Sequence, residues 1–341
     1  MNAAKIRWAA LALGLVLFVA TLAYVDIATA AVTLRRLGLA LPIALAFSGL
    51  WHLARTWAWA ACFPDRHAVR FAHLARVRLA AEAFSYLTFR GVAGEPLKVV
   101  LLADTIDPRQ ATAAVALERL AYLVVNTLIV GLASATALAL LPFTPGWFRV
   151  FRAFAIVAGV LGVLTGLIIA GRGTYLQAPM RGFDRIAGTR IGDGRAGRFV
   201  LAVERLMLDL VRGNPARLAV LVSATALSFL CMVLEAWVVL RAVGAPITAV
   251  GALAVETFSR VASFVSAFIP GNFGALEAMS VGAAAAVGAT SGGAALAVAR
   301  RIRGIFWAGL GLAVYPRPHR PSPPRGGHDV KTSSSFVARG S

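Results

Sequence analysis

Long runs of apolar residues alternate with short polar segments along most of this chain. A helix of about 20 largely apolar residues crosses a hydrocarbon core roughly 30 Å thick, and several runs reach that length. Backbone polar groups in lipid must be satisfied within the segment itself, so each run is expected to be an α-helix. The pattern therefore predicts an all-α, polytopic transmembrane bundle of about eight spans, with one or two re-entrant or broken helices.

The predicted spans form two groups of four, on either side of a polar segment between residues 171 and 215. They are expected near residues 8–25, 37–62, 112–141, 150–170, 217–240, 247–268, 275–293 and 298–315. The first is interpreted as an uncleaved anchor rather than a signal peptide, because a second span follows it directly. Residues 1–315 are thus predicted to be one transmembrane domain. Residues 316–341, rich in Pro, Ser, Gly and Arg, are expected to be a disordered tail that cannot bury a core.

The charge of the chain is strongly basic, with 34 Lys and Arg residues against 15 Asp and Glu residues and a formal net charge of +19. The basic residues concentrate beside the apolar runs, and the segment at 171–215 holds eight arginines against four acidic residues. Basic loops are retained in the cytoplasm. We therefore predict a multi-pass protein of a bacterial inner membrane, with both termini and this loop cytoplasmic. Nucleic acid is not an expected partner, because no basic surface interleaved with aromatic residues is present.

Motifs of soluble enzymes are absent from the sequence, including the nucleophile elbow, the zinc-protease motif and the phosphate-binding loops. Cys62 and Cys231 are far apart in apolar surroundings and have no metal-ligand spacing. Neither a metal nor another cofactor is expected. Candidate chemistry is therefore sought among ionisable residues inside the apolar runs, where each costs a few kcal/mol on insertion scales.

The first group of such residues surrounds a break between two apolar segments. Gly91, Gly94 and Pro96 forbid one continuous helix there. Irregular backbone at membrane depth is tolerated only where protein or a water-filled cavity surrounds it, so the break predicts a re-entrant or broken helix. The polar residues around it are Glu82, Ser85, Arg90, Glu95, Lys98, Glu118 and Arg119.

The helix that leaves this break offers two interpretations. Pro96 suits its first turn, whose exposed N–H groups would attract an anion such as a lipid phosphate. Alternatively, Glu95 caps those N–H groups, or pairs with Lys98 or an arginine.

The second group repeats the arrangement of the first. Residues 256–259 (Glu-Thr-Phe-Ser) share three of four residues with residues 82–85 (Glu-Ala-Phe-Ser), and each precedes a Gly/Pro break that carries a glutamate. Arg260 follows the echo, and Asn272 and Glu277 lie in and after the second break. Interrupted hydrophobic segments at matching places in two halves are typical of a transporter site at the membrane midplane. A chance match in an alanine-rich chain is the alternative.

Isolated polar and aromatic residues have structural interpretations. His52, Arg55 and Glu235 are expected to reach the interface or to pair between helices. The tryptophans at positions 51, 57, 59, 147 and 307 are expected to form belts at the membrane interfaces.

Four segments together resemble the membrane domain of lysylphosphatidylglycerol synthases and its stand-alone, flippase-like relatives. They are residues 94–102 (GEPLKVVLL), 116–119 (ALER), 268–277 (FIPGNFGALE) and 307–311 (WAGLG). The family is also similar to membrane proteins associated with hopanoid biosynthesis and archaeal glycosylation. The resemblance implies a membrane lipid or lipid-linked substrate. In two-domain members a soluble domain makes the aminoacyl lipid, and the membrane domain is assigned its translocation.

The sequence therefore predicts a protein that binds and translocates a phospholipid or lipid-linked substrate bearing an anionic or phosphate group. A soluble aminoacyltransferase domain is not recognised, so a complete synthase is not expected, and a separate lipid-synthesising enzyme is an expected partner. One alternative is a membrane-embedded transferase, or its accessory subunit, with Glu95 or Glu277 as general base. Another is a non-catalytic scaffold. The predicted substrate-binding residues are Arg90, Glu95, Lys98, Glu118, Arg119, Glu256, Arg260, Asn272 and Glu277, with basic groups holding phosphate and acids pairing or relaying protons.

Overall fold

The computed structural model describes residues 27–63, 69–88, 94–170, 213–265 and 274–316, together with a few isolated positions outside these ranges. All regular structure in these residues is helical, which confirms the all-α prediction. Three helices are long and apolar enough to cross a membrane: α6 (Pro108–Leu140), α7 (Pro145–Ala170) and α10 (Pro215–Ala242). The predicted count of eight spans is not confirmed.

The remaining helices are shorter or carry more polar residues. They are α2 (Ile27–Leu37), α3 (Ala40–Ala60), α4 (Phe71–Leu87), α5 (Gly94–Leu102), α11 (Ala249–Val265), α12 (Ala275–Ala286) and α13 (Gly293–Ala313), with a short 3-10 turn, η3 (Thr290–Gly292), before α13. Most of the predicted first span, the tail after residue 316 and most of the basic loop at 171–215 lie outside the described residues.

Two of the long helices, α6 and α10, begin with the same kind of N-terminal cap. The Asp107 side chain accepts a hydrogen bond from the backbone N–H of Arg109 at 2.6 Å, and Asn214 accepts one from Arg217 at 3.0 Å. Each cap is followed by a proline in the first helical turn, where its missing N–H costs nothing. The sequence thus fixes the starts of α6 and α10 before any tertiary packing.

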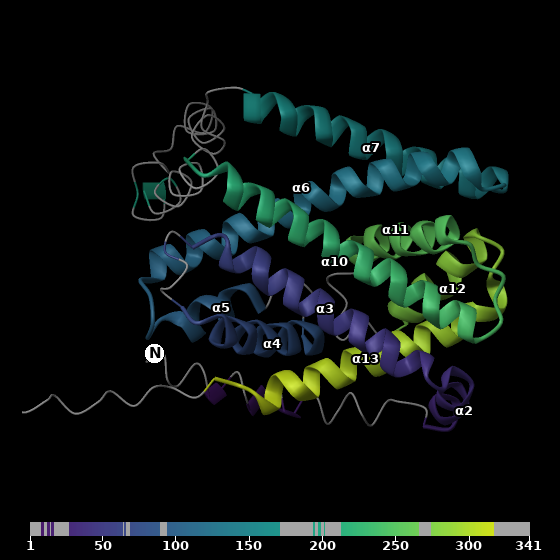
Figure 1. Ribbon diagram of the computed structural model, residues 1–341, viewed down its shortest axis with the longest axis horizontal. Helices are drawn as coiled ribbons and strands as arrows, with labels where there is room; N and C mark the ends of the chain where they lie inside the picture. The colour runs from purple at the N-terminus through teal and green to yellow at the C-terminus, as the bar shows by residue number, and fades with distance from the viewer. Residues whose placement is uncertain are drawn as a thin grey trace, which may run out of the picture.

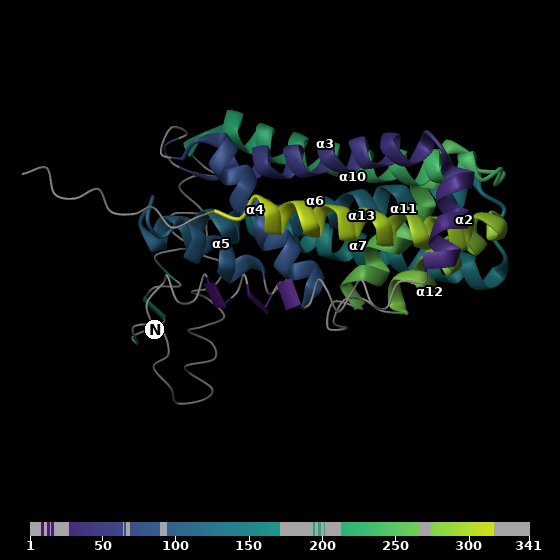
Figure 2. The same cartoon turned by 90° about the horizontal axis from the view of Figure 1, so that it is seen from below.

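Two helix pairs, α4 with α5 and α11 with α12, each contain a helix too short to cross a membrane by itself. α5 has nine residues and α12 has 12, so at 1.5 Å per residue they span about 14 and 18 Å, short of the roughly 30 Å hydrocarbon core. The α4–α5 pair lies at one end of the bundle and the α11–α12 pair at the other (Figures 1 and 2). Segments 247–268 and 275–293, predicted as two spans, thus form the shorter helices α11 and α12.

The two halves are related by an approximate exchange of helices. α3 packs along α10, α4 packs against α13, and α11 packs against α6, so exchanging α3–α6 for α10–α13 preserves this contact pattern. Because the α4–α5 pair and the α11–α12 pair lie at opposite ends of the bundle, the two repeats are inverted relative to each other (Figure 1). The echo at residues 82–85 and 256–259 falls on the equivalent helices α4 and α11. α7 packs on α6 and has no counterpart among the described helices of the second half.

Apolar cores lie toward both ends of the bundle. One contains Trp59 and Leu102, and another contains Leu240 and Leu296. Trp59 and Leu102 lie near the C-terminal ends of α3 and α5, and Leu240 and Leu296 lie where α10 ends and α13 begins. The middle of the bundle is thereby left to polar side chains.

One end of the bundle collects the helix ends next to the segments that are predicted to be cytoplasmic. The C-terminal end of α7, the N-terminal end of α10 and the C-terminal end of α13 all lie at the left-hand end of the bundle in Figure 1. The helix ends that flank the basic loop and the helix end that precedes the tail therefore lie at the same end of the bundle. The assignment of this end to the cytoplasm stays a prediction.

Gly94 allows α5 to approach α4 closely, which gives a testable prediction. A Cβ at this position would lie 3.1 Å from Ser85 Cβ and would overlap the carbonyl oxygen of Ala81. Backbone cannot yield as a flexible side chain does, so Gly94→Ala is expected to lower the stability of the purified protein by about 1–3 kcal/mol. Thermal melting in mild detergent measures this change. Gly159→Ala is the control, because a Cβ there meets no atom within 4 Å; equal melting temperatures for the two variants would contradict the close packing.

Candidate functional site

A cavity of about 180 Å3 lies between the two repeats, and helices α3–α6 and α10–α13 all contribute residues to its wall. Its charged lining is dominated by arginine: Arg55, Arg78, Arg119, Arg260, Arg300 and Arg303 face three glutamates, Glu82, Glu95 and Glu256. The wall itself thus carries six positive charges and three negative ones, and two further glutamates behind it, Glu118 and Glu235, pair with three of its arginines. A buried surface of this kind favours an anion.

The first repeat holds two of these arginines with a carboxylate behind the wall. Glu118 is fully buried, and its Oε1 lies 2.6 Å from Arg55 Nη2 and 3.5 Å from Arg78 Nη1. The Arg55 guanidinium also stacks on Tyr122, 3.6 Å from the ring centroid. Arg55 Nε and Nη1 and Arg78 Nε are buried and have no hydrogen-bond partner among the described residues. These N–H groups are therefore donors that the described residues leave unsatisfied in the interior.

The start of α5 adds an acidic group to the wall. Glu95 Oε2 accepts a hydrogen bond from Lys98 Nζ at 2.8 Å, which agrees with one of the two interpretations of this turn. Glu95 lines the cavity, whereas Lys98 is buried outside the lining, with its Nζ 5.4 Å from the Trp59 ring centroid. Only the acidic partner of this pair therefore lies on the cavity wall.

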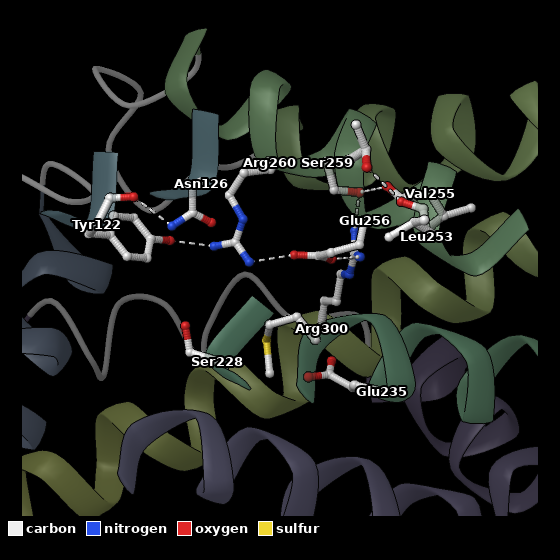
Figure 3. Close-up of polar contacts among 12 residues, drawn as sticks. Tyr122, Asn126, Ser228, Glu235, Leu253, Val255, Glu256, Ser259, Arg260 and Arg300 are labelled. Carbon is white, nitrogen blue, oxygen red and sulfur yellow. Dashed lines mark hydrogen bonds and ion pairs between the residues drawn. The ribbon is translucent and has the colours of Figure 1, made fainter. Parts of the chain in front are cut away.

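The second repeat forms a network centred on Glu256 (Figure 3). Glu256 Oε1 accepts a hydrogen bond from Arg260 Nη2 at 2.7 Å, and its Oε2 accepts one from Arg300 Nη2 at 2.9 Å. Arg260 Nη1 donates to Tyr122 Oη of the first repeat at 2.5 Å, and Arg300 Nη1 donates to Ser259 Oγ at 2.7 Å. One carboxylate thus bridges two arginines that belong to the cavity wall.

The other acidic residues of this repeat lie behind or beside the wall. Glu235 is buried and accepts a hydrogen bond from Arg303 at 2.5 Å. Glu277 pairs with Arg301 at 2.6 Å, and its side chain is 45% exposed. Neither glutamate lines the cavity. The prediction that Glu235 pairs between helices is confirmed, and so is that for Arg55.

Aromatic side chains cover another part of the wall. His52 lies between Trp51 and Trp307, with ring centroids 4.6 and 4.5 Å away. Trp307 Nε1 donates a hydrogen bond to Ser48 Oγ at 2.7 Å. The predicted interfacial role is wrong for Trp51 and Trp307, which line the cavity, and for Trp59, which is completely buried. An aromatic residue in an apolar run has the same local sequence whether it faces headgroups or protein.

The predicted site residues divide into three groups. Glu95, Arg119, Glu256 and Arg260 line the cavity. Lys98, Glu118 and Glu277 lie outside its lining, where Lys98 and Glu118 pair with wall residues and Glu277 pairs with Arg301. Arg90 and Asn272 lie outside the described residues. The role of all nine in binding stays a prediction.

Sequence reasoning did not include four arginines and a tyrosine in the site. These residues are Arg55, Arg78, Tyr122, Arg300 and Arg303. The signal for the last two was present, because three arginines in the apolar run of α13 had to face protein or reach an interface. Facing protein is what the structure shows for Arg300, which is 5% exposed, and for Arg303, whose side chain is 18% exposed and pairs with Glu235.

The fold and the cavity together define a multi-pass membrane protein with a charged chamber between two inverted repeats. The chain belongs to the lysylphosphatidylglycerol synthase TM region family, which it matches over residues 7–311. The resemblance drawn from the four sequence segments is thereby confirmed. None of the curated proteins compared with the chain matches it.

Proposed function

We propose that this protein binds the anionic headgroup of a phosphate-bearing membrane lipid in the cavity and translocates the lipid across the bilayer. The observation that carries the proposal is the wall of six arginines, placed in the middle of the bundle by both repeats. Charges buried at membrane depth are costly and mark substrate pathways. Membership of the lysylphosphatidylglycerol synthase TM region family agrees with a lipid as the substrate.

The chemistry of the wall suits a phosphate group. A guanidinium presents several N–H donors in a fixed plane and binds phosphate oxygens in pairs. Arg55 and Arg78 retain buried N–H groups without a partner among the described residues. A lipid phosphate would satisfy these donors and offset the excess positive charge of the lining.

The inverted repeat supports movement of the bound lipid. In transporters with this symmetry the substrate site lies near the midplane between the repeats, and broken helices help to form it. Here α5 and α12 begin at the two breaks, and both Glu95 of α5 and Leu276 of α12 reach the cavity. A rocking of one repeat against the other would expose the cavity to each leaflet in turn.

Reconstituted vesicles test the proposal. The purified full chain is placed in liposomes with phosphatidylglycerol labelled on an acyl chain by a fluorophore, so that the headgroup stays free. Dithionite bleaches the outer leaflet, and a flippase raises the bleached fraction from about half toward the whole. We expect the fluorescence of labelled phosphatidylglycerol and phosphatidic acid to be lost faster than that of labelled phosphatidylcholine, since the wall carries excess positive charge.

Two comparisons make this experiment decisive. Vesicles without protein set the background rate, and vesicles with a different polytopic protein at the same ratio report leakage of dithionite. Equal rates for all three lipids would contradict recognition by the arginine wall. Rates equal to those of empty vesicles for every lipid would refute translocation.

A further inference from the structure

We infer that Glu256 occupies the position of the substrate's anionic group when the cavity is empty, and that the lipid phosphate must displace it to bind. The inference rests on the proposed function, because it concerns the same cavity. It assigns to Glu256 a role in substrate specificity, beyond its ion pairs with Arg260 and Arg300. A ligand would have to compete with a resident carboxylate.

The geometry around Glu256 is that of a bound two-oxygen anion. Its two carboxylate oxygens accept hydrogen bonds from two different arginines, Arg260 at 2.7 Å and Arg300 at 2.9 Å. Two non-bridging oxygens of a phosphate ester present the same pair of acceptors to guanidinium groups. All three side chains line the cavity, so a ligand there reaches the same donors.

The two arginines are held in place without Glu256. Arg260 also donates to the Tyr122 hydroxyl, and Arg300 also donates to the Ser259 hydroxyl at 2.7 Å (Figure 3). These partners are neutral and come from α6 and α11, so they remain when the carboxylate leaves. The donor pair is therefore preorganised for whichever anion occupies it.

Glu235 shows what a purely structural carboxylate looks like in the same repeat. It pairs with Arg303 and is 2% exposed, but it lies outside the cavity lining and contacts one arginine. Glu256 differs in both respects, since it lies on the wall and bridges two arginines. Glu235→Gln is therefore the matched control for Glu256→Gln.

Binding measured by titration calorimetry on the full chain in neutral detergent tests the inference. The probes are dihexanoyl phosphatidylglycerol and inorganic phosphate. If Glu256 holds the arginines for about nine-tenths of the time, its neutralisation removes that competition and tightens binding by about tenfold. We expect this gain for Glu256→Gln and no gain for Glu235→Gln. A gain for both probes assigns recognition to the phosphate group itself, and a gain for the lipid alone assigns it to the esterified headgroup.

A second variant guards against loss of folding. Glu256→Asp keeps the charge but is one methylene shorter, so it cannot reach both arginines, and we expect a smaller gain of about threefold. If Glu256→Gln does not fold, the binding measured for Glu256→Asp decides whether the inference holds. Binding equal to or weaker than wild type in the folded variants overturns the inference alone. Absence of binding of either probe to wild type and variants overturns the proposed function as well.

Discussion

Glu118→Gln is expected to lower the free energy of unfolding by about 3–5 kcal/mol, the largest loss of stability that we predict. Glu118 is fully buried and lies beside Arg55 and Arg78, which are 3% and 2% exposed. Glutamine keeps the shape of the side chain, so the loss reports the charge alone. Two guanidinium groups would remain in the interior without their nearest counter-charge. Unfolding by sodium dodecyl sulfate in mixed micelles measures the change.

Two further variants identify the cause of that loss. Glu277→Gln also removes a carboxylate from an ion pair, but its side chain is 45% exposed, so we expect a cost of about 1 kcal/mol or less. The double variant Arg55→Gln with Glu118→Gln removes one stranded charge and is expected to recover part of the loss, since the two residues are in contact. A double variant as unstable as the sum of its singles would contradict the ion pair.

Arg119→Gln is expected to reduce lipid binding and translocation by roughly ten- to a hundredfold while leaving the melting temperature near that of wild type. The Arg119 guanidinium lines the cavity, lies 5.8 Å from the Tyr122 ring centroid and forms no ion pair with a described residue. Its removal therefore strands no carboxylate. Loss of one charged hydrogen bond to a phosphate costs about 1.5–3 kcal/mol, which corresponds to that range of affinity.

The matched control is Arg241→Gln, at the end of α10. Arg241 also lies over an aromatic ring, 5.5 Å from the Trp237 centroid, but it is exposed and outside the cavity lining. Vesicle assays and calorimetry on both variants separate a site effect from a general loss of positive charge. Equal activity of Arg119→Gln and wild type would remove Arg119 from the site.

The lengths of the apolar runs predicted the long helices well, because hydrophobicity and helix capping depend on residues that are close together in the sequence. The run expected at 112–141 is α6 (Pro108–Leu140), and its start is fixed by Asp107 and the proline after it. The break before α5 was predicted from Gly94 and Pro96 for the same reason. Whether an apolar helix crosses the bundle or returns is a property of its neighbours, which is why α11 and α12 were expected to be full spans.

The partners of buried charges were harder to predict than their positions. Arg55 and Glu118 are far apart in the sequence, and only the packing of α3 against α6 brings them together. Glu277 carries the sequence signal of a site residue, since it follows a Gly/Pro break, yet the structure pairs it with Arg301 outside the cavity lining. Helical periodicity gives the face of a residue on its own helix but does not say which helix that face meets.

The distribution of ion pairs between the repeats bears on how the chain enters the membrane during synthesis. The strongly buried pairs of α3–α6, such as Arg55 with Glu118, lie entirely within the first repeat, and Arg303 with Glu235 and Arg300 with Glu256 lie within the second. Among the described residues, the hydrogen bond from Arg260 to the neutral Tyr122 hydroxyl joins the two charged networks. Each half can therefore leave the translocon with these charges already neutralised by its own residues, before the other half exists. Docking of the two halves then needs apolar packing and hydrogen bonds to neutral acceptors, such as the Tyr122 and Ser48 hydroxyls, so the costly burial of charge is finished ahead of assembly.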